Sequence, residues 1–264
     1  MKRLLVLAYF YPPLAGGGVP RVLSFTRHLP EHGWACTVVC AGEHDYWVRD
    51  ESLLAAVPAA TEVIRVTGGS GLAAVLRLRG ASTQGRRSST GFAALRALSD
   101  WFLLPDSYAG WARRAVRAAS ARIAAGGIDA VLSSSPPDSV HLAAGQVVRA
   151  ARRGAHRTLP WIADFRDPWI GSHFRTPPTR WHAARHAAME ASVTGGADLV
   201  LAASRTHHDA LAARTVARPA RLLHLPNGFE PGAAAVRAVA NEPGVFRMVF
   251  TGSLSLMEDA GTLL

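Results

Sequence analysis

Short apolar runs alternate with helical patterns along most of this chain, and this alternation constrains its fold more than any other feature. The first run, Arg3 to Tyr9, is apolar almost throughout and ends at two prolines and a triple glycine, as a strand buried on both faces does. A helical pattern follows from Val19 to His32, with Pro20 in its first turn and Gly33 after its end. Repetition of this unit predicts an α/β fold built on a doubly wound parallel sheet.

The same alternation continues almost to the end of the chain. Further strands are expected at 34–41, 61–67, 128–133, 161–164, 198–202, 221–225 and 245–251. Helices are expected at 51–56, 92–103, 110–125, 139–153, 180–194 and 205–214. Two stretches rich in Gly, Ser, Pro or Arg interrupt the pattern: 68–91, which we expect to be a loop excursion, and 229–244, which we expect to be a linker.

Composition excludes several classes of protein. With 264 residues, 49% of them hydrophobic and 18% charged, the chain is long and apolar enough to bury a full core. It contains no apolar run near the roughly 20 residues that cross a bilayer, so we expect a cytoplasmic protein. Cys36 and Cys40 lie in one expected strand, roughly 13 Å apart, which is too far for a disulfide, and we expect them in the core.

The net charge of +10 is unevenly distributed. Between Glu62 and Asp100 there is no acidic residue, and the stretch contains Arg65, Arg77, Arg79, Arg86, Arg87 and Arg96. Such a stretch is attracted to anionic lipid headgroups or to nucleic acid, although a solvated loop in an arginine-rich protein is the alternative. No zinc-finger, helix-turn-helix or ribonucleoprotein motif accompanies the charge, so we expect no nucleic-acid partner.

The connection after the first strand predicts a site for an anionic group. Gly16, Gly17 and Gly18 precede a helix whose amino terminus offers unpaired N–H groups, although the glycines could instead serve only the turn. The dinucleotide fingerprint is not met because Arg21 stands where its third glycine belongs, yet Glu43 could meet a ribose hydroxyl, which leaves a nicotinamide-dependent oxidoreductase open.

A polar cluster follows the strand expected at 161–164. The segment Asp164 to Trp169 (DFRDPW) combines two carboxylates, a guanidinium and an indole at the edge of the sheet where ligands bind. These groups suit a hydroxylated substrate, and an internal Asp–Arg pair that only fixes the loop is the alternative. Ser133 to Pro137 (SSSPP) occupies the same edge one strand earlier.

Two pairs of histidines have spacings that metal sites use. His28 and His32 match H-x-x-E-H, but Pro30 between them opposes the continuous helix that this motif needs. His182 and His186 are four residues apart in an expected helix without an evident acidic third ligand. We therefore expect no metal, and we place the second pair on an exposed helix face.

Taken in order, five segments of the chain resemble the retaining family-4 glycosyltransferases, especially bacterial members that build surface polysaccharides and decorated glycans. The segments are Tyr11-Pro12-Pro13 with the triple glycine, Ser134-Ser135-Pro136-Pro137, the DFRDPW segment, Leu225-Pro226-Asn227-Gly228-Phe229 and Phe250-Thr251-Gly252-Ser253-Leu254.

The resemblance implies a two-domain GT-B fold with a Rossmann-like amino-terminal domain. It assigns residues 1–228 to the acceptor-side domain, 229–244 to a linker and 245–264 to the truncated start of a donor-binding domain. It implies transfer of a sugar from a nucleotide-sugar donor to a glycan or lipid-linked acceptor without a cofactor. Gly16, Gly17, Gly18, Gly252 and Ser253 would face the donor, and Asp164, Arg166, Asp167 and Trp169 would bind acceptor substrate.

The chain departs from the family pattern in two places. Many members carry a histidine in the cleft after the fourth strand, whereas SSSPP stands here and His141 lies further into the expected helix. The family's E-x7-E pair and donor-binding cations would follow Leu254, so no catalytic residue is assigned and the 264-residue chain alone is expected to be inactive. A non-catalytic basic module that docks on a membrane remains an alternative, and an enzyme attached to the inner membrane face is a further hypothesis.

Overall fold

The structure is a computed structural model that describes residues 1–42, 49–68, 100–172, 176–214, 221–229 and 244–246. The chain separates into two compact units, Met1–Asn227 and Gly228–Leu264. Nearly all described residues belong to the first unit. The expected linker and the strand expected at 245–251 fall largely outside the described residues, so the proposed domain division stays a prediction.

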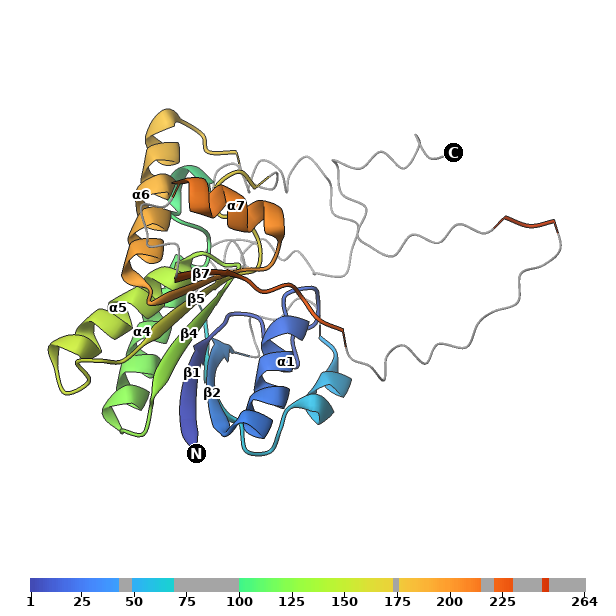
Figure 1. Ribbon diagram of the computed structural model, residues 1–264, viewed down its shortest axis with the longest axis vertical. Coiled ribbons are helices and arrows are strands. Elements are labelled where there is room, and N and C mark those ends of the chain that lie inside the picture. Colours follow the sequence, from blue (N-terminus) through green and yellow to red (C-terminus); the bar gives the residue numbers. More distant parts are fainter. Residues whose placement is uncertain (43–48, 69–99, 173–175, 215–220, 230–243, 247–264) are drawn as a thin grey trace. The chain divides into compact units, whose positions relative to one another are not determined.

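The first unit is built on one parallel sheet of seven strands in the order β3-β2-β1-β4-β5-β6-β7 (Figure 1). All of the neighbouring strands pair in parallel, which confirms the predicted sheet. The strands are β1 (Lys2–Leu7), β2 (Trp34–Ala41), β3 (Glu62–Val66), β4 (Ala130–Ser135), β5 (Trp161–Phe165), β6 (Leu199–Ala202) and β7 (Leu222–His224). The order reverses direction between β1 and β4, which makes that point the topological switch of the sheet.

Within the described residues, helices follow the strands as the alternation predicts, whereas the helix expected at 92–103 and the loop expected at 68–91 lie largely outside them. They are α1 (Pro20–His28), η1 (Leu29–His32), η3 (Glu51–Ala56), α4 (Ala109–Ala124), α5 (Ser139–Arg153), α6 (Arg180–Gly196) and α7 (Arg205–Arg214). The helix expected at 19–32 ends at His28 and continues as a 3₁₀ turn, because Pro30 cannot donate the next helical hydrogen bond. None of the described helices is both long and apolar enough to cross a membrane.

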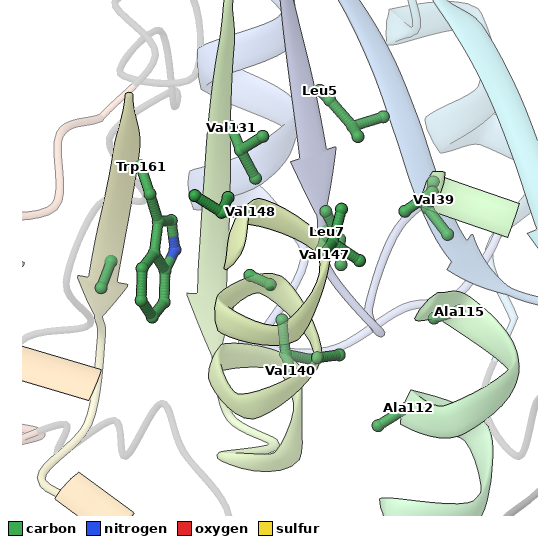
Figure 2. Packing of buried hydrophobic residues seen from close by; sticks show 14 of the residues in the cluster. Leu5, Leu7, Val39, Ala112, Ala115, Val131, Val140, Val147, Val148 and Trp161 are labelled. Atoms are coloured by element: carbon green, nitrogen blue, oxygen red, sulfur yellow. The ribbon is translucent and has the colours of Figure 1, made fainter. Parts of the chain in front are cut away.

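Alternate residues of β1 pack into cores on opposite faces of the sheet, because side chains alternate along a strand. Leu5 and Leu7 join the larger core under α4 and α5, and Leu4 and Val6 join a core under α1. Figure 2 shows the larger core, where residues of α4 and α5 such as Ala115 lie against the sheet.

The two cysteines lie in the core under α1, as predicted. Cys36 and Cys40 are both buried and free. Burial raises the pKa of the Cys36 thiol to about 11 and that of Cys40 to about 12, because a thiolate loses its hydration there.

Candidate functional site

The candidate site lies at the carboxyl ends of β1, β4 and β5, beside the switch in strand order. Ligands of open α/β sheets bind in the crevice outside this edge. Three segments meet here: the glycine loop before α1, the SSSPP segment that begins in the last residues of β4 and the DFRDPW segment that begins in the last residues of β5. The structure therefore brings together three of the segments that the sequence singled out.

The glycine loop ends at the amino terminus of α1, and none of the described side chains caps that terminus. Gly16 adopts a φ of +114°, which favours glycine, and its carbonyl accepts a hydrogen bond from the Val19 N–H at 3.1 Å. Gly16 and Gly17 are exposed. Pro20 has no N–H and the Val19 N–H is bonded to Gly16, so the N–H groups in this first turn that lack a partner within the helix are those of Arg21 and Val22. This end of α1 offers those two N–H groups and a positive dipole to an incoming anion.

Position 18 requires glycine because neighbouring side chains lie too close for a Cβ atom. A Cβ atom there would lie 3.0 Å from the Phe10 ring and 3.1 Å from Nη1 of Arg166. At Gly17, by contrast, an added Cβ would have no atom within 4 Å. The two neighbouring glycines thus have different roles, since only Gly18 is constrained by its surroundings.

Arg166 fixes the glycine loop to the end of β4. Its Nε donates to the Ser135 carbonyl at 2.6 Å, its Nη2 donates to the Pro136 carbonyl at 2.8 Å, and its Nη1 donates to the Gly18 carbonyl. Burial lowers the pKa of this guanidinium, and the neighbouring carboxylates of Asp164 and Asp167 oppose that effect. Arg166 therefore positions backbone rather than offering its donors to a ligand.

Asp164 is fully buried and forms an ion pair with Arg21 of α1. Nη2 of Arg21 lies 2.7 Å from Oδ1 of Asp164, and Nε of Arg21 lies 3.0 Å from Oδ2. The Ser134 hydroxyl donates to Oδ2 at 2.8 Å. The pair thus joins α1, β4 and β5 beneath the candidate site.

The remaining donor of Arg21 reaches the segment after β7. Its Nη1 donates to the Pro226 carbonyl at 3.2 Å and to Oδ1 of Asn227 at 3.1 Å. Sequence reasoning considered an Asp–Arg pair only within DFRDPW, but the partner of Asp164 lies 143 residues away. Arg21 entered that reasoning only as a departure from the dinucleotide fingerprint, and no local signal in the sequence identified its role.

The other two predicted substrate-binding residues lie in different environments. Asp167 is exposed, whereas Trp169 is buried and its Nε1 donates to Nδ1 of His186 at 2.9 Å. The expected exposure of His182 and His186 is wrong, since each is only 5% exposed. They share one stripe of α6 with the buried Glu190, which accepts a hydrogen bond from the Ile170 N–H and pairs with Arg214.

His141 lies in the interior beneath the SSSPP segment. Its Nδ1 is 2.8 Å from the Ser133 hydroxyl, which also accepts from Nε1 of Trp161 at 2.9 Å. Burial lowers the pKa of His141 to about 3, so its ring is neutral at physiological pH. His207, across the Phe165 ring, is also buried, and desolvation lowers its pKa to about 4.

Two further expectations concern metals and residues beyond the described part. Among the described residues, no group of three or more His, Cys, Asp or Glu side chains could hold a metal ion. Glu43, Gly252 and Ser253 lie outside the described residues. Their predicted contacts with a nucleotide therefore stay predictions.

Comparison with known proteins finds likeness in structure only. No protein-family model matches the chain, and no curated protein matches it in sequence. Sucrose-phosphate synthase from Thermosynechococcus elongatus matches with a TM-score of 0.52 and 15% identity over 87% of this chain and 49% of that one.

Two further solved structures match at lower similarity. The glycosyltransferase SsfS6 from Streptomyces sp. SF2575 gives a TM-score of 0.39 and 15% identity, over 76% of this chain and 50% of that one. UGT2 from Phytolacca americana gives a TM-score of 0.42 and 11% identity, over 86% of this chain and 52% of that one. The chain spans about half the length of these proteins.

The likeness to sucrose-phosphate synthase concerns the fold, and it agrees with the strand order and the parallel pairing described above. The described residues thus form a Rossmann-like α/β fold with a parallel sheet, as the sequence predicted.

Proposed function

We propose that this chain is the acceptor-side domain of a retaining glycosyltransferase of family 4, which transfers a sugar from a nucleotide-sugar donor to a glycan or lipid-linked acceptor. The observation that carries the proposal is the uncapped amino terminus of α1 at the switch point of the sheet, with the exposed Gly16 and Gly17 before it. The motif series and the likeness in fold support the same function.

Sugar transfer requires the protein to stabilise negative charge that grows on the departing diphosphate. The N–H groups of Arg21 and Val22 in the first turn of α1 can donate hydrogen bonds to such a group, and the dipole of the helix adds to the attraction. Arg21 is committed to the Asp164 carboxylate and to the segment after β7, so its role here is to hold α1 in place. Arg166 does the same for the glycine loop.

On the acceptor side, the proposal assigns the contact with substrate to Asp167. Asp167 is exposed, whereas Asp164, Arg166 and Trp169 already bond to protein groups. A carboxylate accepts hydrogen bonds from sugar hydroxyls, which suits a glycan or lipid-linked acceptor. The other three residues then support the segment that carries Asp167.

A negative charge placed in the glycine loop tests the donor half of the proposal. Gly17→Asp adds a carboxylate where nothing lies within 4 Å, so it should repel a diphosphate without disturbing the fold. We expect about tenfold weaker binding of nucleoside diphosphates, which corresponds to about 1.4 kcal/mol. Calorimetry with UDP and with thymidine diphosphate measures the affinity, and hydrogen exchange of residues 16–22 locates the bound group.

Gly195→Asp is the matched control. Gly195 is exposed in α6, has open space around its Cβ position and also has no positive φ. The Gly195→Asp variant should bind nucleoside diphosphates with the affinity of the unmodified protein. Equal affinity of the Gly17→Asp variant and the control, or protection of this loop by NAD in place of nucleoside diphosphates, would contradict the proposal.

We also propose an anionic membrane surface as a partner, which would bring the protein to a lipid-linked acceptor. The arginine-rich stretch 77–96 that suggested this partner lies outside the described residues. The chain's net charge of +10 supports attraction to an anionic surface.

A further inference from the structure

Three large aromatic side chains are exposed where the residues before α4 meet the start of α6. Trp101 is 52% exposed, Phe102 77% and Trp181 59%. We call these three residues the aromatic patch. Single exposed apolar residues are ordinary on protein surfaces, but a gathered group of large ones marks an interaction surface.

His182 holds the two tryptophans of the patch together. This buried ring contacts Trp101 at a centroid distance of 5.4 Å and Trp181 at 4.9 Å. Its Nε2 lies 3.2 Å from the Trp101 carbonyl, which can only accept, so Nε2 carries the proton. Its Nδ1 then accepts from the Thr179 hydroxyl at 2.8 Å. The tryptophans are therefore held in place by a buried polar anchor.

Cationic side chains accompany the patch. Arg180 and Arg185 are both exposed on α6, and the Arg185 guanidinium lies 6.0 Å from the centre of the Trp181 ring. The sequence contains no acidic residue from 168 to 189. The surface at the start of α6 thus combines exposed aromatic rings with two exposed arginines, and the acidic residue next to the patch in the sequence is the half-buried Asp100, directly before Trp101.

We propose that the aromatic patch, with Arg180 and Arg185, docks on an anionic lipid bilayer. Tryptophan and phenylalanine partition into the headgroup region, and nearby arginines are attracted to anionic lipids. A second copy of the chain fits this surface less well, because it would bring like charge against it.

The position of the patch gives docking a use. A helix that follows a parallel strand begins at the carboxyl edge of the sheet, so the start of α6 lies at the same edge as the candidate site. Docking there would bring this edge close to a lipid-linked acceptor. The aromatic patch gives the proposed membrane partner a specific binding surface. The benefit of docking for sugar transfer rests on the proposed function.

Vesicle co-sedimentation with the full 264-residue chain tests the proposal. The vesicles are phosphatidylcholine alone, or phosphatidylcholine with about a quarter phosphatidylglycerol, and binding is expected only to the second kind. Arg180→Gln with Arg185→Gln should weaken binding about 30-fold, from the attraction per basic side chain at an anionic surface. Trp101→Ser, Phe102→Ser and Trp181→Ser together should weaken it about tenfold or more.

Matched control variants distinguish binding through the patch from binding through positive charge or exposed apolar side chains at other positions. Arg153→Gln with Arg157→Gln removes the same charge from exposed positions near the other edge of the sheet, and Leu54→Ser removes an apolar side chain of η3 that is 41% exposed. Both controls should bind vesicles like the unmodified protein. Circular dichroism checks that each variant is folded, and the arginine variant changes only exposed side chains.

The proposal is overturned if the patch variants and the controls bind anionic vesicles equally. It is also overturned if the unmodified chain binds no vesicles. Self-association of the chain through the patch, or binding of an acidic protein there, without vesicle binding would have the same consequence. Nucleoside-diphosphate affinity is measured on the same variants. Loss of vesicle binding with unchanged nucleotide affinity supports the patch, whereas absent nucleotide binding with normal docking would count against the proposed transferase alone.

Discussion

Replacing Asp164 by asparagine should strongly destabilise the first unit. The carboxylate is fully buried and receives donors from Arg21 at 2.7 and 3.0 Å and from Ser134 at 2.8 Å. The asparagine amide keeps one acceptor, but its NH₂ group must face one of these donors. Arg21, only 8% exposed, is left as a buried cation without its counter-charge.

The size of the effect follows from the cost of breaking a buried ion pair, which is about 3 to 5 kcal/mol. For a unit of this length, each kcal/mol lowers the melting temperature by about 2 to 4 °C, so the variant should melt about 6 to 20 °C lower. Urea unfolding followed by tryptophan fluorescence measures the free energy, and thermal circular dichroism measures the melting temperature.

A surface pair provides the control for this prediction. Glu51 pairs with Arg49, and its side chain is 61% exposed, so Glu51→Gln should cost less than about 1 kcal/mol. Replacing the buried pair entirely, by Asp164→Leu with Arg21→Met, should recover much of the lost stability because no buried charge remains. A cost below about 1 kcal/mol for Asp164→Asn would refute the claim that this carboxylate anchors α1.

Three further predictions concern single sites. Gly18→Ala should destabilise the glycine loop, because its Cβ would lie 3.0 Å from an aromatic ring, whereas Gly17→Ala should be neutral; hydrogen exchange that is unchanged in both would contradict this. In the folded protein His141 is neutral because its pKa is lowered to about 3, whereas in the unfolded chain it becomes charged below its ordinary pKa of about 6.5. The free energy of unfolding should therefore stay constant above about pH 6.5 and decrease as the pH falls below that value. From pH 7 to pH 5 this should cost about 2 kcal/mol, and a His141→Phe variant should lose less in the same urea titrations. Cys36 and Cys40, with pKa values raised to about 11 and 12 by burial, should resist iodoacetamide in the folded protein and react in urea; rapid alkylation of the native chain would contradict their burial.

Local patterns were sufficient to predict most of the fold. The run from Arg3 to Tyr9 indicated a buried strand, and α5 has the bounds that its helical pattern predicted, 139–153. Such patterns work because a strand buried on both faces needs a continuous apolar run and a covering helix needs an apolar stripe. The right-handed crossover rule then leaves few arrangements besides a parallel sheet.

Local patterns failed for polar residues that pack inside. The buried face of α6 is apolar only near its end, at Val193, yet His182 and His186 are buried too, because Trp169 and the residues before α4 supply their hydrogen-bond partners. A polar side chain is stable in the interior only where a partner meets it, and partners from other elements cannot be read from spacing within one helix.

The sequence by itself thus determined the succession of strands and helices, the parallel sheet and the edge where the candidate site lies, because these follow from backbone geometry and the placement of apolar residues. Only the tertiary structure decided which charged side chains form the ion pairs and hydrogen bonds that stabilise that edge. Arg21 and Asp164 pair across 143 residues, and Arg166 binds backbone of two other segments. The physical reason is that charge pairing depends on distance in space, which sequence separation does not encode.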